Sequence, residues 1–259
     1  GGAEVLRLKA SEPFTLVAGG SAPGTAAAGT PVQIRLDAKD FPLALISPLL
    51  PSSAGVTIGG GTLSGTVAVT AGDNGRALQV TGNLTEGQVA VSGKGLHVEN
   101  LTLTHSFRAA LAELASLDVQ ECVTRIALAG QDVGRIALTG PFDLKTRQGE
   151  PHADIELQPG LLNVAGATLG GYDLGRTAAR FSGSLRLGPN GDMSSQGNLD
   201  LTELTVRAPA LRLPELPPQA VTVRYQVAYA PQAKRLTATE LDARVLQADG
   251  AERLRLRLT

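Results

Sequence analysis

Apolar and polar residues alternate along most of this chain. Leu78, Val80 and Leu84 are separated by polar residues and one glycine, and the same alternation runs from Val221 to Tyr229. A period of two places every second side chain on one face of a β-strand. About 14 such segments follow one another at the close spacing of a meander. We therefore predict an all-β protein, built as an extended, curved antiparallel meander.

Turn residues and phase changes divide these segments. Residues 72–75 (GDNG) and 188–191 (GPNG) are typical of hairpin turns, because glycine and asparagine tolerate positive φ. Within Val98–Leu101 and Leu201–Leu204 the alternation changes phase without a full turn. A phase change of this kind predicts a β-bulge or a bend that re-aims the strand.

Helical signals are few. Residues 41–50 follow Asp40, are followed by Pro51, and favour a short helix. Residues 107–117 place three large apolar side chains at helical spacing, although the segment also fits a strand edge followed by a loop. The sequence predicts one or two short helices beside the sheet.

Two pairs of segments resemble each other. Residues 130–137 (GQDVGRIA) match residues 171–178 (GYDLGRTA), and residues 96–103 (LHVENLTL) echo residues 199–206 (LDLTELTV). Irregular repeats of strand pairs favour a sheet that grows by addition. We expect residues 1–259 to form one continuous segment of a longer chain, with a sub-repeat boundary near residues 105–120.

Composition narrows the possible functions. The 259 residues carry a formal net charge of -1, which argues against a nucleic-acid binder, since that function needs a surplus of basic residues. One cysteine, Cys122, excludes a disulfide framework. Aromatic residues make up 3% and tryptophan is absent, so the apolar surface is mostly aliphatic.

Catalytic and metal-binding motifs are not recognisable in the chain. Residues 60–65 have phosphate-loop spacing but lack the lysine that must follow. The histidines form no H-x-x-x-H pair, and His97 and His105 are expected to face solvent from strands. Cys122 fits a small strand residue better than a catalytic thiol. We expect a protein that is not an enzyme and needs no metal or cofactor.

Each predicted strand has one aliphatic face, and this face must be covered by protein or by a ligand. A β-sandwich would pack two such faces together, and a sheet closed on itself would turn one face inward. An open groove would instead cover its face with acyl chains, and Gly82 and Gly183 on the apolar phase would leave room for a ligand or for curvature. The candidate groove residues are Leu78, Val80, Leu84, Val89, Val91, Ile136, Leu138, Leu185, Leu187, Val221, Val223 and Val227.

Residues 41–51 (FPLALISPLLP), residues 59–67 (GGGTLSGTV) and the glycine-rich strand openings at 130 and 171 carry a family resemblance. Together they resemble the repeat boundaries of the AsmA-like superfamily, bridge-like lipid transport proteins of Gram-negative envelopes. The resemblance implies an open β-taco groove in the middle of a longer periplasmic chain anchored in the inner membrane. It also implies that phospholipid acyl chains are the ligand and that inner- and outer-membrane proteins are the partners at the two ends. A structural, adhesive or secretion-system β-repeat module is the alternative.

Overall fold

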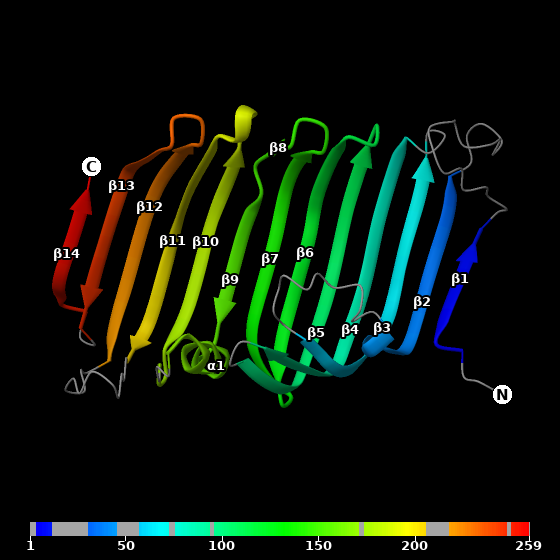
Figure 1. Cartoon of the computed structure of the whole chain (residues 1–259), viewed down its shortest axis with the longest axis horizontal. Coiled ribbons are helices and arrows are strands. Elements are labelled where there is room, and N and C mark those ends of the chain that lie inside the picture. The colour runs from blue at the N-terminus through cyan, green and yellow to red at the C-terminus, as the bar shows by residue number, and fades with distance from the viewer. Residues whose placement is uncertain are drawn as a thin grey trace.

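The structure is a computed structural model that describes residues 4–11, 31–45, 57–72, 76–93, 96–170, 174–205, 218–247 and 250–258. All described strands belong to one 14-stranded sheet, shown in Figure 1. The all-β prediction is therefore confirmed. The sandwich alternative required two packed sheets, whereas the described strands form one open sheet. The two edge strands, β1 and β14, do not pair with each other.

Strands and helices follow in a simple order along the chain. The strands are β1 (Leu6–Ala10), β2 (Val32–Pro42), β3 (Thr57–Gly72), β4 (Ala77–Gly93), β5 (Leu96–Ala112), β6 (Ser116–Leu128), β7 (Gln131–Asp143), β8 (Gln148–Gly149), β9 (His152–Leu157), β10 (Ala178–Leu187), β11 (Met193–Leu204), β12 (Gln219–Ala230), β13 (Arg235–Leu246) and β14 (Glu252–Leu258). The helices are the 3-10 turns η1 (Leu43–Leu45) and η5 (Pro189–Gly191) and the α-helix α1 (Pro159–Gly170).

Each strand pairs antiparallel with its neighbours in the chain. The exception is the middle of the sheet, where β8 and β9 share one position between β7 and β10. The sheet thus has 13 positions, and at about 4.8 Å per position it spans about 58 Å across the strands. Its longest strands have 17 residues, or about 55 Å.

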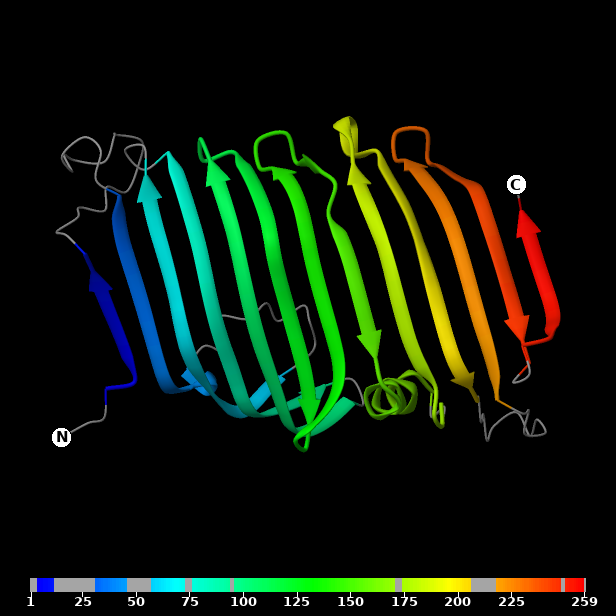
Figure 2. The same ribbon diagram turned by 180° about the vertical axis from the view of Figure 1, so that it is seen from behind.

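A row of β-bulges crosses the lower end of the sheet, the end at which β2 stops and β3 begins. Asp40, Gln88, Asn100 and Glu203 each have positive φ, between 49° and 57°, and each lies at a register shift. Bulges bend a strand and increase its twist. Both views show the lower ends of β3, β4 and β5 turning out of the plane of the sheet (Figures 1 and 2).

The two bulges expected from phase changes are confirmed. The one in residues 98–101 contains Asn100, and the one in residues 201–204 contains Glu203. These two residues hold the same position in the sequence echo between residues 96–103 and 199–206. The echo therefore reflects a shared bulge at the lower end of the sheet.

The closed core of the described chain is small and lies at this lower end. The buried apolar side chains are Leu43, Val89, Val98 and Val133, all at most 8% exposed. Leu43 of η1 approaches Gly61, and the helix α1 sets Leu161 against Gly134 and Gly160 against Val133. The helix is tied down by Asn163, which donates to the Gly175 carbonyl and accepts from the Leu174 N–H.

Several local predictions are decided by the structure. For residues 107–117 the helix is wrong and the alternative, a strand followed by a loop, is confirmed: β5 continues to Ala112, the chain turns at residues 113–115, and β6 follows. Within residues 41–50 the described part contains the 3-10 turn η1, and residues 46–50 lie outside the described residues. The turn at 188–191 is confirmed, with positive φ at Asn190 and Gly191.

Other predictions fall outside the described residues. These are most of the turn at residues 72–75 and the start of the second glycine-rich repeat at 171–173. The sub-repeat boundary near residues 105–120 stays a prediction, and the described sheet passes through this region in the β5–β6 hairpin.

Gly65 lies where strands β3 and β4 approach each other closely. Its φ is +139°, and an added Cβ would overlap the Asn83 carbonyl oxygen on β4. Gly65→Ala should therefore lower the free energy of unfolding by about 2 kcal/mol or more. Gly60→Ala, in the same strand but with open space at the Cβ position, is the control and should be nearly neutral. Equal effects in urea unfolding would contradict this account of β3.

Candidate functional site: the apolar face of the sheet

The strand register places all 12 candidate groove residues on one face of the sheet, which we call the apolar face. Residues directly opposite each other in paired strands share a face. One such row crosses all 13 positions of the sheet. In order it contains Leu6, Ala38, Gly65, Leu84, His105, Thr124, Ile136, Ile155, Phe181, Leu199, Val223, Ala243 and Leu256.

The other candidates occupy neighbouring rows of the same face. Leu138 pairs with Cys122 and Ala153, and Val221 pairs with Leu201 and Val245. The sequence prediction of a shared face is therefore consistent with the register of every strand involved. Contact of these residues with lipid stays a prediction.

The apolar face is also longer than the sequence reasoning anticipated. Leu8, Leu36 and Val67 extend it through β1 to β3, and Leu241 pairs with Leu258 at the other edge. The period-two pattern of residues 32–38 and 66–71 was the signal that could have revealed β2 and β3. The face thus reaches both edge strands.

Exposure distinguishes two parts of this face. At the bent lower end, Val89 is only 1% exposed. Away from it, Leu138 is 41% exposed, Leu185 is 37%, and Leu254 near the last edge is 62%. Large apolar side chains so widely exposed over contiguous strands mark an interaction surface. The described chain therefore covers one end of its apolar face and leaves the rest open.

Phenylalanine rings, and not open space, lie over the glycines of this face. The Phe107 ring occupies the place that a Cβ of Gly82 would take, and Phe181 lies 2.8 Å from the corresponding position at Gly183. Phe181 also stacks on Tyr225, with 6.4 Å between ring centroids. The expectation that Gly82 and Gly183 leave room for a ligand is therefore wrong, and the alternative that they allow curvature stays a prediction. The two glycines make room for the rings of Phe107 and Phe181.

A polar cluster interrupts the apolar face on β4, β5 and β6. His105 Nδ1 lies 2.9 Å from the Thr124 hydroxyl, and His105 Nε2 lies 3.6 Å from a carboxylate oxygen of Glu86. The side chains of Glu86 and His105 are 25% and 27% exposed. The expectation that His105 faces solvent is therefore wrong, whereas His97 is widely exposed beside Glu99.

The opposite face, which we call the polar face, carries charged and hydroxyl side chains. Near one edge, Asp37 accepts from Arg35 and Thr66 and lies 3.9 Å from Lys9. Near the other edge, Asp242 accepts from both Arg244 and Arg255. The strand register thus places leucine and valine side chains on one face of the sheet and the charged and hydroxyl side chains on the other.

Hydrogen bonds on the polar face shift the pKa of several carboxyl groups downward. Donation from Arg35, and then from Thr66, lowers the pKa of Asp37. A hydrogen bond from Ser182 lowers the pKa of Asp154. The Arg244 and Arg255 guanidinium groups hold the pKa of Asp242 far below its ordinary value. Each shift stabilises the ionised carboxylate in the folded sheet.

Within the described part of the chain, no group of three or more His, Cys, Asp or Glu side chains is placed to hold a metal ion. Cys122 is a half-buried strand residue opposite Phe107 and Leu138. None of the described helices is long and apolar enough to cross a membrane. Comparison of the chain with protein-family models, curated proteins and solved structures found no match.

Asp242 provides a pH-dependent test of the polar face. Arg244 and Arg255 lie directly opposite each other on β13 and β14, so the carboxylate offsets a like-charge pair. Because the folded-state pKa of Asp242 is lowered, its stabilisation is full above about pH 4 and is lost as the pH falls through the folded-state pKa. Asp242→Asn should lower the thermal midpoint at pH 7, by a margin that shrinks below pH 4.

Circular dichroism melts between pH 2 and 7 make this comparison. Asp200→Asn, on the polar face of β11, is the matched control and should change the midpoint little at any pH, because Arg180, directly opposite on β10, pairs with Glu156 instead. A deficit in Asp242→Asn that stays constant from pH 7 to pH 2 would contradict the assignment.

Proposed function

We propose that the apolar face is a lipid-conducting surface, on which phospholipid acyl chains are shielded from water while they move between inner and outer membranes. The observation that carries the proposal is the open aliphatic face that continues from β1 to β14. Lipid chains are the ligand best matched to such a face, because they are apolar, flexible and make no directional demands on it. The resemblance to the AsmA-like superfamily points to the same ligand.

The dimensions of the face suit this ligand. Half of a bilayer core, about 15 Å, is the depth that one acyl chain covers. Strands of 12 residues, such as β11, β12 and β13, are about 40 Å long and can carry a whole chain lying along the strand. The 58 Å width allows several chains side by side. Lipids could thus follow one another across the strands.

Apolar side chains are exposed at both edges of the sheet, which favours lipid that moves across the sheet over lipid that is held on it. Leu8 on β1 is 62% exposed, and Leu256 and Leu258 on β14 are 55% and 52% exposed. The apolar surface is therefore not closed off by polar residues at either edge. Under this proposal the segment works in the periplasm as a middle part of a bridge, and proteins of the two membranes receive lipid at its ends. No catalytic step is involved.

Leu138→Asp tests the proposal directly. Leu138 lies near the middle of the apolar face on β7 and is 41% exposed, so the sheet should tolerate the change. A carboxylate against acyl chains is strongly unfavourable, and each 1.4 kcal/mol corresponds to a factor of ten, so lipid binding should weaken by about tenfold or more. Photo-crosslinking with a diazirine-labelled phosphatidylethanolamine measures the bound lipid.

Two further variants separate the explanations. Thr139→Asp places the same charge on the neighbouring residue, on the polar face opposite His152, and should bind lipid as the unmodified protein does. Val89→Asp, at the closed lower end, should unfold the sheet. Unfolding of Leu138→Asp would instead show a filled protein core and favour a structural or adhesive module. Equal crosslinking in Leu138→Asp and Thr139→Asp would contradict the lipid surface.

A further inference from the structure

A cavity of about 400 Å³ lies at the upper end of the sheet, between the β10–β11 and β12–β13 hairpins. Its floor is a straight cross-strand row on the polar face. Arg186 pairs with Ser194, Ser194 pairs with Ala228, and Ala228 pairs with Thr237, so four adjacent strands contribute one residue each. The two small residues in the middle of the row leave the space above them open.

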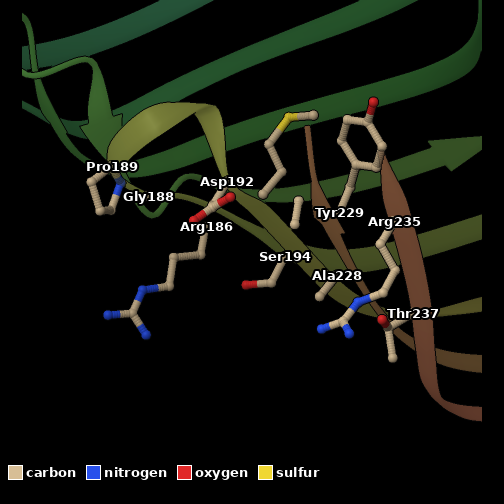
Figure 3. A pocket seen from close by; sticks show the side chains of 11 residues that line it. Arg186, Gly188, Pro189, Asp192, Ser194, Ala228, Tyr229, Arg235 and Thr237 are labelled. Atoms are coloured by element: carbon tan, nitrogen blue, oxygen red, sulfur yellow. The ribbon is translucent and has the colours of Figure 1, made fainter. Parts of the chain in front are cut away.

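Two arginines flank this open space. Figure 3 shows the side chains of Arg186 and Arg235 on the same side of the sheet and at opposite ends of the cavity, with Ser194 and Ala228 between them. Arg235 lies two residues before Thr237 on β13 and therefore shares its face. The row from β10 to β13 spans about 14 Å, a distance over which two extended arginines can approach one ligand from both sides.

Neither arginine is neutralised within the described part of the chain. The ion pairs in this half of the sheet use Arg176, Arg180, Arg244 and Arg255, and neither Arg186 nor Arg235 takes part in one. The polar side chains nearest the floor, Ser194 and Thr237, are hydroxyls that can donate hydrogen bonds. Two positive charges and two hydroxyl groups therefore line the cavity, together with apolar residues such as Pro189 and Ala230.

We propose that this cavity binds a phosphate group. Guanidinium groups recognise phosphate through paired, charge-assisted hydrogen bonds. A tetrahedral phosphate has oxygens to offer two guanidinium groups and two hydroxyls at once, whereas a planar carboxylate has only two oxygens. The site lies on the polar face, so it depends on neither the apolar face nor its acyl chains. Its phosphate comes from a phospholipid head group or from free phosphate.

Asp192 allows a second test of the phosphate site, because its carboxylate lies on the wall of the same cavity. A negative charge there opposes an anionic ligand. Removal of this charge in Asp192→Asn should therefore tighten phosphate binding, whereas removal of either arginine charge should weaken it. Opposite effects of opposite charges at one site are difficult to produce by a general loss of structure.

The experiment measures inorganic phosphate binding by isothermal titration calorimetry at low ionic strength. We expect binding to weaken about tenfold in Arg186→Gln and in Arg235→Gln, and to strengthen in Asp192→Asn. Arg135→Gln, on the polar face of β7 and outside the cavity, is the matched control and should bind phosphate normally. Acetate at the same concentration should compete poorly.

A second arm distinguishes the sources of the phosphate. Vesicles of phosphatidylcholine with and without 20% phosphatidic acid are floated with each variant. Arginine-dependent flotation with phosphatidic acid identifies a lipid head group as the ligand, and calorimetric binding without flotation identifies free phosphate; both support the site. Absence of binding in both arms, or equal binding by Arg186→Gln and Arg135→Gln, would overturn it. These outcomes are independent of crosslinking at Leu138, so the two proposals fail separately.

Discussion

The structure depends on one constraint: an antiparallel sheet with one apolar face has no second layer in the described chain to cover that face. Backbone hydrogen bonds between neighbouring strands hold the 13 positions together, while few apolar side chains are fully buried. A sheet of this kind is stable as a ladder of cross-strand contacts. Among the described residues, large apolar side chains of this face, such as Leu138 and Leu254, are therefore exposed, and a function for the sheet has to account for what covers them.

The described chain covers its own apolar face only at the lower end of the sheet. The bulges at Asp40, Gln88, Asn100 and Glu203 bend the strands there, and η1 and α1 pack against the bent region. Elsewhere two of the aromatic rings take the space beside glycines: Phe107 lies over Gly82, and Phe181 lies beside Gly183. The cluster of Glu86, His105 and Thr124 is a polar step in this surface, which a lipid chain crossing β5 would meet.

Much of this architecture follows from the sequence because the alternation of side chains is a local property. It predicted most of the strands from β4 onward, both phase-change bulges and the common face of the 12 candidate residues, whereas the same alternation in β2 and β3 was overlooked. The helix expected over residues 107–117 failed because Phe107, Ala109 and Leu111 also alternate, and their pairing with β4 decides for strand. The helix α1 was missed because Gly160, Gly166 and Gly170 weaken its helical signal. The Arg186–Arg235 cavity was invisible because its residues meet only through strand register.

Quantitative analysis of lipid extracted from the purified protein tests the central claim most directly. The protein is isolated without detergent, extracted with organic solvent, and its phospholipid content is measured by mass spectrometry against the protein concentration. An open apolar face that carries acyl chains predicts at least one phospholipid per chain, reduced in Leu138→Asp and retained in Thr139→Asp. A folded protein that contains no phospholipid, and acquires none when incubated with vesicles, would contradict the account.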